Sequence, residues 1–197
     1  MCDRVACQQG AILRVTGGTA RGVSLVSPKA PGVRPTTDRV RSALFNILTQ
    51  YGLDGVVIAD LFAGTGSLGI EALSRGAAHA DFVEADRRQI TVIKSNLRAT
   101  GFADRSTVLA GKAEEITTRL GLYDYVVMDP PYSQPFPTSL IVKLGSFEVL
   151  AANGILICGH ATRVTAPERC GTLARWDDRR YGDTSLAFYS PLEEVVG

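Results

Sequence analysis

The stretch Asp60-Leu61-Phe62-Ala63-Gly64-Thr65-Gly66-Ser67-Leu68-Gly69 carries most of the information about the fold of this chain. It continues an apolar run that begins at Val56 and is typical of a buried strand. Its glycines allow a sharp turn and let a ligand approach the backbone closely. A helical pattern follows as far as Arg75, and Gly76 is a natural C-cap. The stretch therefore predicts a strand, a ligand-binding turn and a helix, which together open an α/β fold.

Strand and helix patterns continue to alternate after this unit. Predicted strands comprise residues 56–61, 80–85, 107–110, 124–129, 154–159, 173–181 and 185–190. Predicted helices comprise residues 36–51, 87–99, 113–120 and 137–151, besides the one that ends at Arg75. The last two strands leave no room for a helix between them, so they must pair antiparallel. We expect a three-layer, Rossmann-like α/β fold whose mostly parallel seven-stranded sheet ends in an antiparallel hairpin.

The residues before the first predicted helix are organised differently. Residues 1–10 show no periodicity, and we expect a disordered leader there. Ile12 to Val26 alternate apolar and polar residues around Gly17-Gly18, which predicts a small N-terminal β-hairpin. A Pro/Gly-rich linker follows. The expected organisation is a leader (1–10), a hairpin with its linker (11–35) and one α/β domain (36–197).

The composition is that of one ordinary globular domain. The 197 residues are 45% hydrophobic and 21% charged, and the mean hydropathy is +0.09. No apolar run approaches the ~18 residues of a membrane span, and the first residues lack a signal-peptide core. We expect a cytoplasmic monomer that binds no membrane. Four cysteines without C-x-x-C spacing and two histidines form no metal-ligand pattern, so no metal is expected.

The net charge of +1 conceals an uneven distribution. Residues 1–48 carry seven Lys or Arg against two Asp, whereas residues 49–197 carry 14 basic and 18 acidic residues. A basic front on a mildly acidic body suits a polyanion bound on one face. A solvated arginine-rich arm without a ligand is the alternative interpretation.

Asp129-Pro130-Pro131-Tyr132 ends a later apolar strand abruptly, because prolines interrupt a sheet. The strand thus leaves a carboxylate, a rigid run of carbonyls and an aromatic ring at its carboxyl end. A carboxylate and a carbonyl can accept both hydrogens of a planar amino group while the ring stacks on the attached base. We therefore expect methyl transfer to an exocyclic amino nitrogen.

The glycine-rich turn matches G-x-G-x-x-G, and Glu84 follows 20 positions after Gly64 at the end of the next strand. A carboxylate there suits ribose hydroxyl groups, so both NAD and S-adenosylmethionine fit the pattern. Asp60 favours the methyl donor, because a carboxylate attracts a cationic amino group and repels a pyrophosphate. Asp86 competes with Glu84 for the ribose, and a turn without a ligand is a further alternative. We predict S-adenosylmethionine as the cofactor.

The run from Arg14 to Tyr189 resembles the bacterial 16S ribosomal RNA (guanine-N2-)-methyltransferase family, the RsmD-like enzymes. The glycine-rich turn and the tetrapeptide are shared by many amino-methyltransferases. Arg14-Val15-Thr16-Gly17-Gly18 and above all Arg34-Pro35-Thr36-Thr37-Asp38-Arg39-Val40-Arg41 make the resemblance more specific. It implies a class I methyltransferase fold, S-adenosylmethionine as donor, and one guanine of 16S rRNA as acceptor, within a 30S particle or an assembly intermediate.

The expected site residues fall into three groups. The catalytic group comprises Asp129, Pro130, Pro131 and Tyr132. The cofactor-binding group comprises Asp60, Phe62, Ala63, Gly64, Gly66, Glu84, Ala113 and Asp129, with Phe62 expected mainly beneath the turn. The RNA-binding group comprises Arg14, Arg21, Arg34, Arg39 and Arg41, a basic track that includes the N-terminal hairpin. Many relatives of the wider superfamily carry Asp or Asn where this chain has Lys112-Ala113, so backbone groups near Ala113 are left to contact the adenine.

Three other functions share part of these motifs. A DNA adenine-N6 or cytosine-N4 methyltransferase usually adds a sequence-reading domain, for which this chain has no spare length. A protein-glutamine methyltransferase typically has Asn in place of Asp129 and leaves the basic front unexplained. A non-catalytic nucleic-acid-binding module does not need both motifs intact. Tyr181-Gly182-Asp183-Thr184 is either a simple turn or a segment that reaches toward the substrate.

Overall fold

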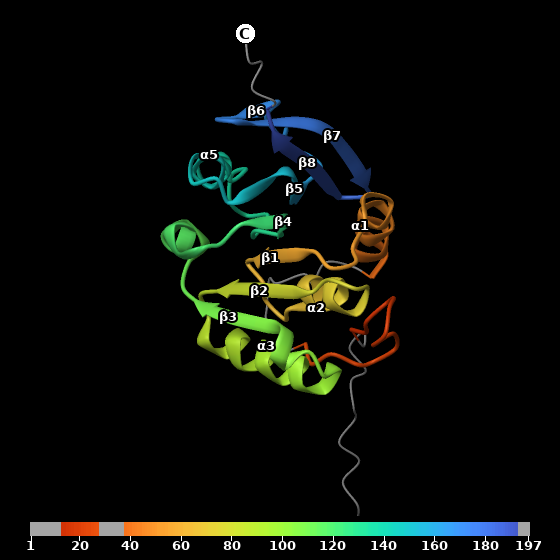
Figure 1. Cartoon of the computed structure of the whole chain (residues 1–197). Helices are drawn as coiled ribbons and strands as arrows, with labels where there is room; N and C mark the ends of the chain where they lie inside the picture. Colours follow the sequence, from red (N-terminus) through yellow and green to blue (C-terminus); the bar gives the residue numbers. More distant parts are fainter. Residues whose placement is uncertain (1–12, 28–37, 193–197) are drawn as a thin grey trace, which may run out of the picture.

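The computed structural model describes residues 13–27 and 38–192. Within these ranges, eight strands form one sheet in the order β3-β2-β1-β4-β5-β8-β7-β6 (Figure 1). The strands are β1 (Val57–Leu61), β2 (His79–Glu84), β3 (Ser106–Ala110), β4 (Tyr123–Met128), β5 (Leu150–Ala161), β6 (Arg169–Cys170), β7 (Leu173–Tyr181) and β8 (Thr184–Pro191). Pairs among β1 to β5 are parallel, and those that join β5 to β8, β7 and β6 are antiparallel. The predicted fold class is confirmed, and β6 adds a two-residue strand to the seven expected.

Helices cover both faces of the sheet. They are α1 (Asp38–Tyr51), α2 (Ser67–Ser74), α3 (Arg87–Thr100), α4 (Ala113–Ile116) and α5 (Thr138–Ser146). The first three share one hydrophobic core with sheet residues such as Ile58, Phe82 and Val127. The last two share another core with Leu61 and Met128. Alternate residues of each strand thus enter opposite cores, and α5 lies across the sheet from α1 and α2 (Figure 1).

The order of the strands along the sheet changes direction between β1 and β4. Strand β1 pairs with β2 on one side and with β4 on the other. The connections that leave these neighbouring strands diverge, which opens a crevice at their carboxyl ends. Leu61 of β1 is in register with Met128 of β4. The glycine-rich turn and Asp129 therefore leave the sheet side by side.

Helix α5 is shorter than the sequence pattern predicts. It ends at Ser146 rather than at residue 151, and β5 begins at Leu150 rather than at residue 154. Glu148 adopts a left-handed φ of 49°, which turns the chain out of the helix. Val149 and Leu150 continue the apolar spacing of the helix, but they are buried after its end, in the core that α4 and α5 share with the sheet. Periodicity alone does not separate these two placements.

The N-terminal segment, residues 13–27, forms the expected hairpin only in part. A single antiparallel bridge joins Arg14 and Ser24. The turn of the segment docks on α2, where Thr19 N donates to the Ser74 carbonyl at 2.7 Å. Gly18 has a φ of 75°, and a Cβ there would stand 1.8 Å from the same carbonyl oxygen. Only glycine allows this approach. The expected leader (1–10) and the linker (28–35) lie outside the described residues.

A buried carboxylate anchors the same segment. Glu71 of α2 is 0% exposed and accepts hydrogen bonds from Thr16 N at 2.8 Å and Thr16 Oγ1 at 2.6 Å. Arg75 Nε donates to Glu71 at 2.8 Å, and Arg41 Nε of α1 lies 3.5 Å from the same carboxylate. Burial lowers the pKa of Arg41, and the charges of Asp38 and Glu71 oppose this shift only in part. Removal of one member of such a buried cluster leaves an uncompensated charge. The segment, α1 and α2 thus meet in one ion cluster.

Asn96 of α3 connects the N-terminal segment with the glycine-rich turn. Its Oδ1 accepts a hydrogen bond from Val26 N at 2.8 Å. Its Nδ2 donates to Val26 O at 3.1 Å and to Thr65 O at 2.9 Å. The side chain is buried, so these hydrogen bonds satisfy polar groups that water cannot reach. One amide therefore supports both the segment and the turn.

Candidate active site

Left-handed backbone shapes the turn between β1 and α2. The φ angle is 62° at Phe62, 54° at Gly64 and 77° at Gly66, the residue before α2. A left-handed residue other than glycine stores strain, which gathers at ligand-binding sites. Gly69 lies against the ring of Phe82, where a Cβ would come within 2.4 Å. Glycine at this position keeps the first turn of α2 close to the sheet.

Two carboxylates predicted to bind the cofactor hold this turn. Asp60 Oδ2 accepts a hydrogen bond from Gly69 N at 2.9 Å, and Glu84 Oε2 accepts one from Gly64 N at 2.8 Å. Glu84 Oε1 also accepts a hydrogen bond from Asp86 N at 2.8 Å. The structure thus brings Asp60 and Glu84 together at the carboxyl ends of β1 and β2. The carboxylate of Asp86 caps α3 instead, as a hydrogen-bond acceptor for the helix backbone.

The carboxyl groups of Asp60, Glu84 and Asp129 gather at this edge of the sheet. Complete burial raises the pKa of Asp60 well above its ordinary value, and the charges of Asp129 and Glu84 raise it further. The hydrogen bond from Gly69 N acts in the opposite direction on this pKa. Carboxylates that disfavour one another's ionisation favour a positively charged ligand among them. The electrostatics fit a cationic methyl donor better than a dinucleotide with a pyrophosphate.

A cavity of about 480 Å³ has Glu84 in its wall, whereas Asp60 and Asp129 do not line it. Its walls come from the ends of β1, β2 and β3, from the start of α4 and from the segment after β4, and include Phe62, Val83, Glu84, Gly111, Lys112, Ala113, Pro131 and Gln134. This size suits a nucleoside, and the apolar walls are interspersed with the polar side chains of Glu84, Lys112, Glu114, Glu115 and Gln134. Phe62 both packs against the core and lines the cavity. The cavity unites three of the expected cofactor residues, namely Phe62, Glu84 and Ala113.

The tetrapeptide Asp129–Tyr132 stands at the same edge, directly after β4. Gly159 of β5 leaves room for it: a Cβ there would stand 2.6 Å from Asp129 Oδ1 and 3.4 Å from the Tyr132 hydroxyl. The Tyr132 hydroxyl donates to Thr184 Oγ1 at 3.5 Å. Burial and the charge of Asp129 raise the pKa of Tyr132, so the phenol stays protonated at neutral pH. Pro131 lines the nucleoside-sized cavity, so this cavity adjoins the tetrapeptide.

The arginines expected to bind RNA do not form one continuous track in the described structure. Arg14 and Arg21 are exposed on the N-terminal segment, and Arg39 is exposed on the first turn of α1. Arg34 lies outside the described residues. The structure places Arg41 in the interior.

Arg41 requires a correction. Its side chain is 0% exposed, whereas the sequence pattern assigned it to a surface that contacts phosphates. Its Nη2 donates to the Arg14 carbonyl and to Asp38 Oδ1, and its Nε faces Glu71. The helical pattern missed this because it counts apolar side chains, and here a cation faces the core to meet a buried anion. Arg41 joins α1 to α2 and cannot reach RNA.

Sequence reasoning also missed residues that support the site. Gly159 leaves the space beside Asp129, and Glu71 and Asn96 hold the N-terminal segment against the cofactor turn. A glycine at the end of a predicted strand is a signal of close approach, and it could have indicated Gly159. Helical i,i+4 spacing pairs Glu71 with Arg75. No sequence signal pairs Glu71 with Thr16 or Arg41, because these two residues lie on separate elements.

Residues 13–190 match the model of a family described as Conserved hypothetical protein 95. The chain belongs to this family. YlbH of Bacillus subtilis, whose name assigns it provisionally to the rRNA methyltransferases, is 35% identical over 181 residues, or 90% of this chain and 98% of that protein. Ribosomal RNA small subunit methyltransferase D of Escherichia coli is 43% identical over 121 residues, or 61% of this chain and 60% of that protein. The resemblance to RsmD-like proteins is confirmed.

Solved structures agree with this membership of the Conserved hypothetical protein 95 family. The Escherichia coli protein yhhF, described provisionally as a methyltransferase, is 32% identical with a TM-score of 0.79, over 91% of this chain and 97% of that one. SMU.776, solved as a complex with SAH, is 15% identical with a TM-score of 0.65, over 85% of this chain and 53% of that one. The second likeness shows the fold alone. The chain is a methyltransferase with the class I fold.

Two features are absent from residues 13–27 and 38–192. No helix there is both long and apolar enough to span a bilayer. No group of three or more His, Cys, Asp or Glu residues in the same ranges is arranged to hold a metal ion.

Proposed function

We propose that this chain transfers a methyl group from S-adenosylmethionine to the exocyclic N2 amino group of a guanine in 16S rRNA. The observation that carries the proposal is the adjacency of Asp129–Tyr132 to the glycine-rich turn, set by the register of Leu61 with Met128. The printed names of similar proteins support ribosomal RNA as the substrate class. The exposed arginines Arg14, Arg21 and Arg39 support a polyanionic partner. The proposal includes a 30S particle or assembly intermediate as substrate and a monomeric, cytoplasmic enzyme.

The residues that would hold the cofactor surround the cavity beside β1 and β2. Glu84 would accept hydrogen bonds from the ribose hydroxyls, and Phe62 and Ala113 would form walls for the adenine. Asp60 would pair with the cationic amino group, because a nearby cation favours the ionised form that burial disfavours. Backbone groups of the turn complete the set: Ala63, Gly64 and Gly66. When bound, S-adenosylmethionine supplies an electrophilic methyl group on a positively charged sulfur.

Asp129 and Pro130 would orient the acceptor nitrogen. The lone pair of a guanine N2 is delocalised into the ring, so the free amino group is a poor nucleophile. Asp129 would accept one N–H and the Pro130 carbonyl the other, which fixes the direction of the nitrogen and favours a tetrahedral arrangement as its charge develops. The nitrogen loses one proton in the reaction, either to Asp129 or to solvent. Positioning and electrostatics together carry the catalysis.

Tyr132 and Pro131 would hold the base itself. The Tyr132 ring is half-buried and restrained by its contact with Thr184, so its face can stack on a base with little loss of rotamer entropy. A guanine inside a helix cannot reach this edge. The target nucleotide therefore lies in a loop or leaves its helix to be modified.

Replacement of Asp129 tests this chemistry. Asp129→Ala removes the acceptor and should lower kcat by about 100-fold or more. Asp129→Asn keeps the shape and one acceptor, so it should lie between alanine and wild type. Asp104→Ala, which removes an exposed carboxylate remote from the tetrapeptide, is the matched control. Full activity of Asp129→Ala would exclude the proposed role.

The substrate needs a separate measurement. Transfer of tritiated methyl groups should be compared for 30S particles, naked 16S rRNA, DNA and release factor. Nucleoside mass spectrometry of the labelled RNA should then detect N2-methylguanosine. Label that enters only DNA or protein, or another nucleoside, would overturn the proposed substrate.

A further inference from the structure

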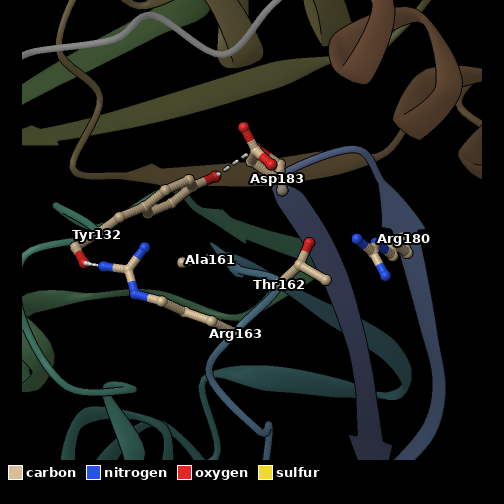
Figure 2. A pocket seen from close by; sticks show the side chains of 7 residues that line it. Tyr132, Ala161, Thr162, Arg163, Arg180 and Asp183 are labelled. Carbon is tan, nitrogen blue, oxygen red and sulfur yellow. Dashed lines mark hydrogen bonds between the residues drawn. The ribbon is translucent and has the colours of Figure 1, made fainter.

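A second cavity, of about 510 Å³, opens beside Tyr132 (Figure 2). Its walls come from the tetrapeptide after β4, from the turn after β5 and from the β7–β8 hairpin, with Tyr132, Thr162, Arg163, Arg180, Asp183 and Thr184 among them. The tetrapeptide separates this cavity from the cofactor cavity, because Pro131 lines one and Tyr132 the other. We call it the hairpin pocket.

Hydrogen bonds tie the walls of the hairpin pocket together. Thr162 N donates to the Asp183 carbonyl at 2.9 Å, and Thr162 Oγ1 donates to the Gly182 carbonyl at 3.0 Å. Thr162 Oγ1 also lies 3.1 Å from Ser185 Oγ at the start of β8. The turn after β5 and the hairpin therefore form one rigid wall. A pocket of this kind binds its ligand without first ordering its own loops.

Arg163 and Arg180 bring positive charge to the hairpin pocket. They come from separate elements and lie to either side of Thr162 (Figure 2). Arg163 Nη2 donates to the Tyr132 carbonyl at 3.4 Å, and Arg180 Nε donates to the Gly182 carbonyl at 3.1 Å. These bonds orient the two side chains, and each guanidinium has further N–H donors for a ligand. The planar donor fork of arginine matches a phosphate.

Asp183 makes the two ends of the hairpin pocket differ in charge. Its carboxylate lines the same cavity, near the hydroxyl end of the Tyr132 ring (Figure 2). A phosphate is repelled from this end and attracted to Arg163 and Arg180. An uncharged base is favoured at the ring of Tyr132, where it can stack.

We propose that the hairpin pocket receives the target nucleotide, with Arg163 and Arg180 binding the phosphates that flank it. The inference rests on the proposed function and extends it, because it assigns substrate contacts to the turn after β5 and to the β7–β8 hairpin. A nucleotide held in this way has its base against Tyr132 and its amino group at the edge occupied by Asp129. The segment 181–184 then acts in substrate binding and is more than a connecting turn.

The test is the salt dependence of RNA binding by Arg163→Ala/Arg180→Ala. In-vitro transcribed 16S rRNA and 30S particles are the two probes. Their affinities are measured over a range of KCl concentrations, by filter binding for the RNA and by co-sedimentation for the particles. Each lost phosphate contact to single-stranded RNA should reduce the slope of log K against log [salt] by about 0.7, so by about 1.4 in total. A slope change of about 1.4 corresponds to roughly 25-fold weaker binding at ~0.1 M salt, relative to ~1 M.

Matched variants separate a phosphate contact from a general effect of charge. Arg98→Ala/Arg119→Ala removes two exposed arginines outside the hairpin pocket and should change the slope much less. Arg163→Lys/Arg180→Lys keeps both charges and should recover most of the slope. All variants should bind S-adenosylmethionine like the wild type, because the two arginines lie outside the cofactor cavity.

Affinity and slope of Arg163→Ala/Arg180→Ala equal to those of the wild type, or of the control pair, would overturn the inference. So would a wild-type protein that binds neither the naked RNA nor 30S particles. Failure of the proposed function is read separately: the wild-type protein would then transfer no methyl group to 16S rRNA or 30S particles. A wild type that methylates while the double alanine variant binds RNA normally would leave the function intact and remove the role of the pocket.

Discussion

Replacement of Gly159 by alanine tests whether the position of Asp129 controls the reaction. The new Cβ would stand 2.6 Å from Asp129 Oδ1 and 3.4 Å from the Tyr132 hydroxyl. To restore an ordinary contact of at least 3.4 Å, the carboxylate oxygen must retreat by about 0.8 Å. A displacement near 1 Å in a group that orients a reactant lowers the rate by up to about 100-fold. We therefore expect kcat to fall by ~10- to 100-fold, which equals about 1.4–2.7 kcal/mol in the activation barrier.

The assay is steady-state methyl transfer with saturating 30S particles and saturating S-adenosylmethionine, which gives kcat. Gly121→Ala is the matched control, because a Cβ at Gly121 meets nothing within 4 Å. It should retain wild-type kcat. Thermal unfolding and cofactor binding are measured in parallel to confirm that Gly159→Ala still folds and keeps its cofactor site. A folded Gly159→Ala variant with wild-type kcat would refute the reasoning, since the carboxylate would have moved without consequence.

Two predictions concern the supports of the site. Glu71→Ala leaves the buried Arg41 with one partner fewer and should lower the free energy of unfolding in urea by about 3 kcal/mol. As the control, Glu115→Ala breaks an exposed pair with Lys112 and should lower that free energy by less than about 1 kcal/mol. Equal losses of unfolding free energy in the two variants would contradict the role of the buried cluster. Asp60→Asn should raise the melting temperature of the ligand-free protein at neutral pH and weaken S-adenosylmethionine binding, because burial raises the pKa of Asp60 and its ionised form opposes folding. The folded state takes up the Asp60 proton at a higher pH than the unfolded state, so the gap in melting temperature should narrow as the pH falls through this raised pKa. A gap that is constant with pH would show that Asp60 ionisation does not oppose folding.

The bounds of several helices and strands follow from short-range sequence patterns. Apolar runs and glycine stops predict β1 and α3 to within one residue at each end, and β7 at both ends. The end of α5 was not predictable in this way, because Val149 and Leu150 fit either a helix or a strand by spacing. Their placement depends on the left-handed turn at Glu148 and on the sheet that receives them.

The positions of some residues in the candidate site follow from the sequence, and those of others depend on contacts between separate elements. The placement of Asp60, Glu84 and Asp129 at one edge of the sheet was predictable. The sequence shows where their strands end, and the carboxyl ends of neighbouring parallel strands lie at the same edge. The placement of Arg41 was not predictable, because its environment is made by Glu71 of another helix and by the N-terminal segment. The hairpin pocket was equally hidden, since Arg163 and Arg180 are 17 positions apart and meet only through antiparallel pairing of β7 with β8 and of β8 with β5.

The amide of Asn96 has a practical consequence for anyone who shortens this chain. The Asn96 side chain is hydrogen-bonded to both Val26 and Thr65. A fragment that starts at α1 would lack the two hydrogen bonds between Asn96 and Val26, and also the hydrogen bond that Thr16 N donates to Glu71. In such a fragment, the Asn96 side chain would keep only its hydrogen bond to Thr65 in the glycine-rich turn. Residues 13–27 are therefore a structural support of the α/β domain. An exchange of this segment between homologues must include the residues of α2 and α3 that contact it.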